Sequence, residues 1–153
     1  MKIQVRVNQL PIELVSRTDE TLLAALRRAG FQSVRLTCGI GVCGVCTVLI
    51  DDSPISSCLV LAPAAAGREI TTTEGLADDD PVAVAFQEVS AFQCGYCTPG
   101  FVLTARALLA ETPNPSDLEI RHAMAGNLCR CGSYLKITKA VRLAATRSRL
   151  DSN

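Results

Sequence analysis

The sequence predicts an α+β unit followed by a small all-α bundle. Three observations support this prediction. Short segments near the start alternate apolar and polar residues, helical patterns bounded by proline fill the second half, and the character of the chain changes near residue 75. Residues 1–75 are therefore expected to form the α+β domain and residues 76–153 the helical domain.

The first half is expected to begin with a hairpin, because residues 3–7 alternate as a half-buried strand does and residues 12–15 fit the returning strand. Thr18-Asp19-Glu20 predicts the start of a helix, with acidic groups at the positive end of its dipole, and Gly30 predicts its end. Three further strands complete the expected order, at residues 46–50, 54–57 and 70–72.

The second half is expected to contain four helices, so it is predicted to be a small bundle. Pro81 and Pro99 suit first helical turns. Ser116 and Glu119 have the Ser-x-x-Glu form of a capping box. The expected helices lie at residues 81–89, from 99 to a proline-rich break at 112–115, at 116–125 and at 136–148.

The composition excludes several classes of partner. Fifteen basic residues balance fifteen acidic ones among 153, and there is no Trp, which disfavours nucleic acid and anionic membranes. No apolar run reaches the ~20 residues of a membrane helix. No secretory signal is visible, so the eight cysteines indicate metal or redox chemistry. We expect a cytoplasmic protein, unless a partner that carries a signal exports it.

Four cysteines of the first half have the C-x4-C-x2-C…C spacing of plant-type [2Fe–2S] ferredoxins. They are Cys38, Cys43, Cys46 and Cys58. Three thiolates on one tight loop can wrap a cluster, and a fourth from another segment closes it. Interleaved glycines allow backbone N–H groups to point at the cluster sulfurs. A four-cysteine zinc site remains an alternative, although zinc ribbons favour paired C-x2-C knuckles.

The other four cysteines form a C-x2-C pair and a C-x-C pair. They are Cys94, Cys97, Cys129 and Cys131. The first pair alone would fit a thioredoxin-like dithiol, but that function needs a βαβ context. The C-x-C spacing is awkward for a disulfide and suits two ligands of one metal centre. The two pairs together give a second site of four thiolates, for which zinc is the main alternative to an iron–sulfur cluster.

These segments resemble the small iron–sulfur subunit of the xanthine oxidase family of molybdenum hydroxylases. The resemblance rests on residues 36–48, 93–100 and 126–131, and it extends over nearly the whole chain with all eight ligand positions filled. It implies a plant-ferredoxin-like (β-grasp) first domain with one [2Fe–2S] cluster. It also implies a helical second domain whose [2Fe–2S] cluster lies nearer the molybdenum.

The resemblance also implies a role for the chain. Gln93 and the Cys131 region would approach the pterin of a molybdenum cofactor held by a separate large subunit. The family oxidises an aldehyde or an N-heterocycle, and electrons leave through the two clusters, so this chain would hold no catalytic residue. Gly132-Ser133-Tyr134, where many members have Thr-Gly-Tyr, is similar to the isoquinoline and nicotinate oxidoreductase branch. That branch often passes electrons to a cytochrome instead of a flavin subunit.

Two other functions fit the cysteine content, a free-standing two-cluster ferredoxin and a zinc-stapled interaction module. Balanced charge disfavours a free carrier, because such carriers usually use a charged face for steering. Zinc is colourless, so visible absorption identifies the interaction module. Co-purification of a large molybdenum subunit distinguishes the hydroxylase subunit from the free carrier.

Overall fold

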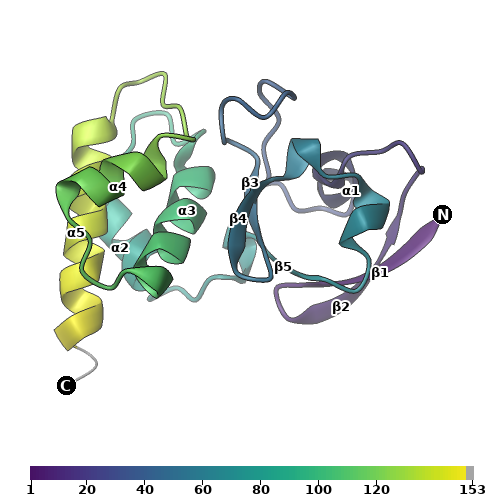
Figure 1. The fold of residues 1–153 in the computed structure, drawn as a ribbon, viewed down its shortest axis with the longest axis horizontal. Coiled ribbons are helices and arrows are strands. Elements are labelled where there is room, and N and C mark those ends of the chain that lie inside the picture. The colour runs from purple at the N-terminus through teal and green to yellow at the C-terminus, as the bar shows by residue number, and fades with distance from the viewer. Residues whose placement is uncertain (151–153) are drawn as a thin grey trace.

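A five-stranded mixed sheet and a group of helices lie side by side in the computed structural model, which describes residues 1–150 (Figure 1). The sheet order is β2-β1-β5-β3-β4, with β1 and β5 parallel and the other neighbours antiparallel. The strands are β1 (Lys2–Val7), β2 (Leu10–Val15), β3 (Thr47–Ile50), β4 (Ser53–Ser56) and β5 (Glu69–Thr71). Helix α1 (Leu22–Arg28) packs its leucines into the core over this sheet. The expected α+β, β-grasp arrangement is confirmed.

The first hairpin follows the expected alternation. In β1, Ile3, Val5 and Val7 are buried and the residues between them are exposed. The turn is tight, because Asn8 and Gln9 both adopt positive φ, at 53° and 68°. Strand β2 therefore begins at Leu10, two residues before its expected start.

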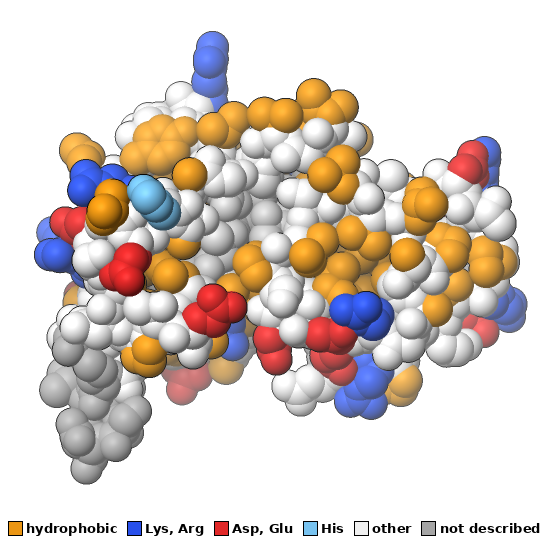
Figure 2. Space-filling view, in the orientation of Figure 1, with side chains coloured by type: hydrophobic (Ala, Val, Ile, Leu, Met, Phe, Trp, Pro, Cys, Tyr) orange, Lys and Arg blue, Asp and Glu red, His pale blue; other side chains and the backbone are white. Residues whose placement is uncertain are grey.

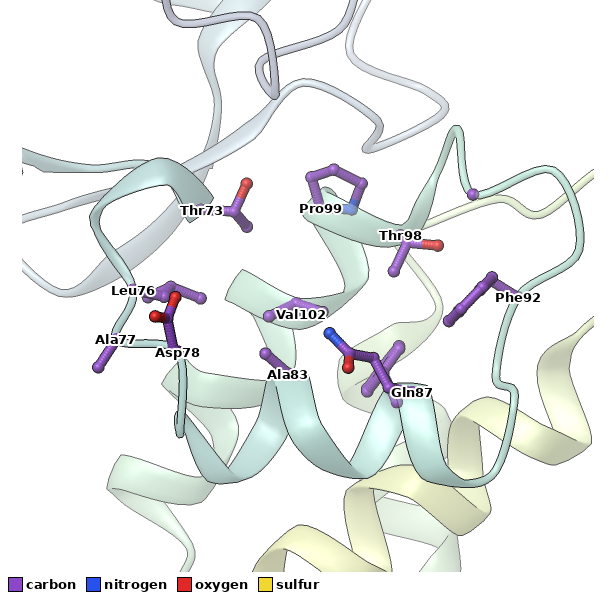
Figure 3. Close-up of a pocket in the computed structure, with 12 residues that line it drawn as sticks. Thr73, Leu76, Ala77, Asp78, Ala83, Gln87, Phe92, Thr98, Pro99 and Val102 are labelled. Atoms are coloured by element: carbon purple, nitrogen blue, oxygen red, sulfur yellow. The ribbon is translucent and has the colours of Figure 1, made fainter.

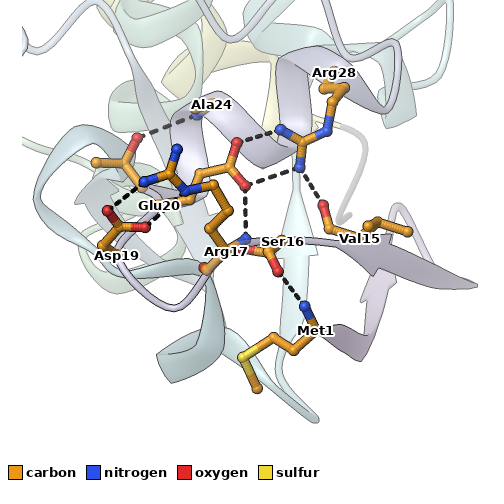
Figure 4. Close-up of polar contacts among 9 residues, drawn as sticks. Met1, Val15, Ser16, Arg17, Asp19, Glu20, Ala24 and Arg28 are labelled. Carbon is orange, nitrogen blue, oxygen red and sulfur yellow. Dashed lines mark hydrogen bonds and ion pairs between the residues drawn. The ribbon is translucent and has the colours of Figure 1, made fainter.

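The predicted start of helix α1 at Thr18 is wrong. Thr21 caps the helix instead, by accepting the N–H of Ala24 at 3.3 Å. Glu20 lies before the helix and forms an ion pair with Arg28 of the last turn, with Nη2 and Oε2 2.9 Å apart (Figure 4). This long-range partner holds the acidic segment outside the helix.

Residues 76–150 contain the four expected α-helices. They are α2 (Pro81–Glu88), α3 (Thr98–Glu111), α4 (Asp117–Met124) and α5 (Tyr134–Leu150). The capping box of Ser116 and Glu119 is present in both directions, as predicted. Asp80 caps α2 by accepting the N–H groups of Val82 and Ala83. Residues 151–153, the end of the predicted second domain, lie outside the described residues.

Strand β3 is buried along its whole length, because both of its faces are covered. Val48 and Ile50 belong to the core between the sheet and α1. Leu49 points the other way and packs with Leu103 and Ala107 of α3. The helical half therefore lies directly against the sheet, with α3 beside β3 and β4 (Figure 1).

The segment that joins the halves packs against the helices. Thr73, Leu76 and Asp78 line a cavity of about 430 Å³ together with residues of α2 and α3 (Figure 3). The buried Thr98 hydroxyl, at the start of α3, has no hydrogen-bond partner among the described residues. Because Thr73, Leu76 and Asp78 line the cavity together with the helices, the linker is part of the packed structure. None of the helices described here has the length and apolar character needed to cross a bilayer.

Candidate metal centres

The two cysteine loops meet on one side of the molecule, where the two halves adjoin. In Figure 1, the loop before β3 and the loop between α4 and α5 both rise at the top of the view. The Leu128 N–H, next to Cys129, donates to the carbonyl oxygen of Cys43 at 2.9 Å. None of the eight cysteines, all of which lie among the described residues, forms a disulfide. The structure therefore brings the two predicted sets close to one another.

The first set is arranged around backbone N–H groups. Those of Ile40 and Cys43 point at the Cys38 sulfur from 3.5 and 3.4 Å. They lower the pKa of the Cys38 thiol to about 6, assisted by the Cys43 thiol. Burial and then the adjacent Cys46 raise the pKa of Cys58 to about 11. The thiols thus lie as two pairs, Cys38 with Cys43 and Cys46 with Cys58.

A 3₁₀ turn, residues Ser57–Leu59, carries Cys58 into the interior. The sequence predicted that a strand would run through residue 57. The strand ends at Ser56 instead, because the Ser57 hydroxyl and N–H both turn back to the Cys46 carbonyl oxygen. This contact brings the fourth cysteine of the first set next to the third.

The second set is also arranged in pairs. A hydrogen bond from the Tyr96 backbone, followed by the neighbouring Cys131, lowers the pKa of Cys94. Burial, followed by the neighbouring Cys129, raises the pKa of Cys97 to about 12. Burial opposes ionisation of Cys129, but the N–H of Ser133, 3.4 Å from its sulfur, and other hydrogen bonds lower its pKa overall.

The donor sets fit a dinuclear cluster. Each iron of a [2Fe–2S] cluster takes two cysteine thiolates, and N–H groups directed at sulfur stabilise the negative cluster. Among the described residues, no three thiols converge as a single metal ion would require. A cavity of about 410 Å³ is lined by Cys94, Cys97 and Cys129, and also by Cys43 of the first set.

The cysteine side chains differ in their exposure to solvent. Cys43 and Cys129 are buried where the loops meet, whereas Cys94 is exposed and Cys131 half-buried. Gln93 is exposed beside them, and its Nε2 donates to the Cys131 carbonyl oxygen at 3.2 Å. The two residues that the resemblance places near a pterin are therefore in contact with one another.

Several residues that support these loops were not predicted. The Tyr134 hydroxyl accepts the N–H of Cys129 at 2.8 Å. Arg35 donates to the Gly95 carbonyl oxygen at 2.7 Å and lies 5.0 Å from the centre of the Tyr96 ring. Tyr96 in turn donates to the Leu36 carbonyl oxygen at 2.8 Å. The contacts of Arg35 and Tyr96 join segments 60 residues apart, whereas Tyr134 and Cys129 are 5 residues apart. Tyr134 belongs to the altered motif, and Leu36 and Tyr96 lie in segments that carry the resemblance, but none of these contacts was predicted.

The fold and the two thiol sites define a two-centre iron–sulfur protein, and family comparisons agree. Residues 5–75 match the 2Fe-2S iron-sulfur cluster binding domain, and residues 72–142 match the [2Fe-2S] binding domain. The chain is 45% identical to a nicotinate dehydrogenase subunit of Pseudomonas putida, over 96% of each chain. It is 44% identical to the nicotinate dehydrogenase small FeS subunit of Eubacterium barkeri, over 95% of each.

A solved structure shows the same architecture. The crystal structure of quinoline 2-oxidoreductase from Pseudomonas putida 86 superposes with a TM-score of 0.93 at 40% identity, over 98% of this chain and 96% of that one. The chain belongs to the small iron–sulfur subunits of the xanthine oxidase family of molybdenum hydroxylases. It is an electron-transfer subunit of a multi-subunit oxidoreductase and binds two [2Fe–2S] clusters.

Proposed function

We propose that this chain carries electrons from a large molybdenum subunit, through its helical half and then its sheet half, to an external acceptor. When bound, each cluster accepts and releases one electron at a time. The observation that carries the order is the exposure within the second set. Cys94 and Cys131 face outward beside Gln93, whereas Cys129 is buried against the first loop.

The eight cysteines are proposed as the ligands, two to each iron. The four pairs are Cys38 with Cys43, Cys46 with Cys58, Cys94 with Cys131 and Cys97 with Cys129. This pairing is supported by the contacts between the thiols. The N–H groups of Ile40, Cys43 and Ser133 would remain directed at ligand sulfurs.

Gln93 is proposed to contact the pterin of the molybdenum cofactor. Its side chain is exposed, and its amide offers both a donor and an acceptor, which suits the polar edge of a pterin. The hydrogen bond to the Cys131 carbonyl oxygen orients this amide and ties it to a ligand of the second set. Gln93 and Cys131 together would then form the side of the helical half that faces the cofactor.

Exposed apolar side chains surround both loops and are proposed to dock the partners. Figure 2 shows such side chains gathered along the top edge of the molecule. Those near the second loop, proposed to face the large subunit, are Phe92, Tyr96, Leu128, Tyr134 and Leu135. Those near the first loop, proposed to face the acceptor, are Leu36, Ile40, Val42 and Leu59.

The acceptor is proposed to be a flavin subunit or a cytochrome that docks beside Cys38. Ser133 and Tyr134 of the altered motif contact Cys129, so they belong to the second set and not to the acceptor side. The absorption spectrum of the purified complex distinguishes flavin from haem.

We further propose a domain boundary after residue 75. It is supported by the family matches, because the first match ends at residue 75 and the second begins at residue 72. Eight cysteines kept as thiolate ligands, with no disulfide among the described residues, favour assembly in the cytoplasm.

Purification of the complex tests this function. We expect a large molybdenum-containing subunit to co-purify, with about four iron atoms and four acid-labile sulfides per small chain. Iron without a co-purifying large subunit would instead indicate the free ferredoxin. Stoichiometric zinc without sulfide would indicate the zinc-stapled module and would refute the proposal.

A further inference from the structure

A backbone hydrogen bond links a cysteine of the first set to the residue that precedes a cysteine of the second set. The Cys43 carbonyl oxygen accepts the Leu128 N–H at 2.9 Å, and Leu128 directly precedes Cys129. Only the backbone of one residue and this hydrogen bond therefore separate a cysteine of the first set from one of the second. The other hydrogen bond described between the two loops joins Asn127 to Gly44, so it does not involve a cysteine. In the bond from Leu128, a cysteine is itself the acceptor.

The neighbouring Asn127 holds this connection in place. Its side chain is buried, with 5% of its surface exposed. Its Nδ2 donates to the Gly44 carbonyl oxygen at 2.9 Å, and its Oδ1 accepts from the Thr104 hydroxyl at 3.1 Å. One amide thus ties together the first loop, the second loop and helix α3.

The backbones approach so closely here that side chains would not fit. A Cβ on Gly44 would lie 2.3 Å from the Gly126 carbonyl oxygen, and Gly44 also has a positive φ of 65°. A Cβ on Gly100 of α3 would lie 2.5 Å from the Gly44 carbonyl oxygen. The glycines permit the contact, and Asn127 fixes its geometry.

We propose that Asn127 is a positioning residue that locks the two loops together, so that electrons cross between the halves along Cys129, Leu128 and the carbonyl group of Cys43. This inference rests on the proposed electron-transfer function. One electron leaves the second site and reduces the first, and no bond is made or broken. Asn127 touches neither a sulfur nor a substrate in this arrangement, so its effect is on the separation and rigidity of the loops.

The test is Asn127→Asp in the assembled, cluster-loaded enzyme. The variant keeps the shape but replaces the donor to Gly44 with a carboxylate, which repels that carbonyl oxygen. We expect hydrogen-exchange protection of the Leu128 amide to fall about 5- to 30-fold, as for loss of one to two hydrogen bonds. We also expect the magnetic splitting between the two reduced clusters to narrow in EPR. The exposed Asn114→Asp is the matched control and should change neither quantity.

Two further variants keep the inference falsifiable if Asn127→Asp fails to fold. Thr104→Val removes only the hydroxyl that supports Asn127, and it should give a smaller effect of the same sign. Gly44→Ala should separate the loops. Its control, Gly67→Ala, has a similar positive φ of 75° with nothing within 4 Å of the added Cβ.

The outcomes separate the inference from the proposed function. Wild-type protein without iron would refute the function itself. Iron-replete variants at both Thr104 and Gly44 with unchanged splitting and unchanged Leu128 protection would overturn only the role of Asn127. Equal losses in Gly44→Ala and Gly67→Ala would also overturn it, because backbone strain alone would then explain the effect.

Discussion

Leu49 of strand β3 packs against Leu103 of helix α3, so an apolar contact joins the sheet half to the helical half. Both side chains are almost completely buried, at 5% and 1% exposure. The two halves bind separate clusters, and we expect this contact and the bonded loops to couple their folding. The apolar contact and the proposed path of the electrons therefore lie at the same junction between the halves.

The variant Leu103→Ala is expected to lower the free energy of unfolding by about 2–5 kcal/mol, the usual cost of such a cavity. Because Leu103 supports both halves, the loss of helical circular dichroism and the loss of cluster absorbance should shift together in denaturant. Leu118→Ala on the surface of α4 is the control, with an expected change within about 0.5 kcal/mol. Two separate steps in the cluster absorbance, of which only one shifted in Leu103→Ala, would show that the halves unfold separately.

The stability of the sheet half should depend on pH through Glu20. The guanidinium group of Arg28 lowers the pKa of Glu20 from 4.5 to about 2. A carboxylate with a lowered pKa contributes stability above about pH 4.5 and loses it as the pH falls toward 2. Glu20→Gln should therefore reduce the melting temperature at pH 7, and the gap from the native protein should narrow below pH 4.5. A gap independent of pH would contradict this, and the exposed Glu111→Gln is the control.

The fold was largely predictable because most of its elements are determined locally. The capping box of Ser116 and Glu119 defined the start of α4 correctly, since both partners lie within one helical turn. The start of α1 was not predictable in this way. Glu20 is held outside the helix by Arg28, and that contact exists only after the chain folds.

The sequence grouped the cysteines of the candidate site, but it did not indicate the residues that support their loops. Spacing alone grouped the eight cysteines into two sets. The pairing within each set depends on tertiary contacts, such as the 3₁₀ turn that carries Cys58 toward Cys46. Asn127 and Thr104 stand 23 residues apart and carry no local signal that they meet. Prediction therefore reached the chemistry of the loops but not the contact between them.

Gln93→Ala tests the proposed contact with the pterin. The iron content and visible spectrum should remain nearly unchanged, because the side chain donates to the backbone oxygen of Cys131 and not to its sulfur. Reduction of the clusters by substrate should become slower, measured by stopped-flow absorbance. The matched control is Gln32→Ala, which also loses a side-chain hydrogen bond to a backbone oxygen, that of Arg27 at 3.1 Å. Equal rates in both variants would exclude a role for Gln93 at the cofactor.

Cys58→Ala is expected to remove one cluster and keep the other. The proposed second set takes no ligand from the first half, so the iron content should fall from about four to about two per chain. The reciprocal variant Cys97→Ala should show the same fall in iron content. The EPR signal of the first-set cluster should then remain, and that of the second-set cluster should be lost. Loss of both signals in a folded Cys58→Ala protein would show that the two sites assemble as one unit.

The same pair of variants determines the order of electron flow. In Cys58→Ala, substrate should still reduce the remaining cluster, because the outward side of the second set, at Cys94 and Cys131, lies beside Gln93 and is proposed to face the molybdenum subunit. Delivery to the external acceptor should stop, since Cys38 and its set are proposed to lie on the path outward. In Cys97→Ala, substrate should fail to reduce the first cluster at all, although dithionite still reduces it. A rapid-freeze EPR time course measures both results. If substrate reduced the first cluster in Cys97→Ala at the native rate, electrons would enter through the sheet half and the proposed order would be reversed.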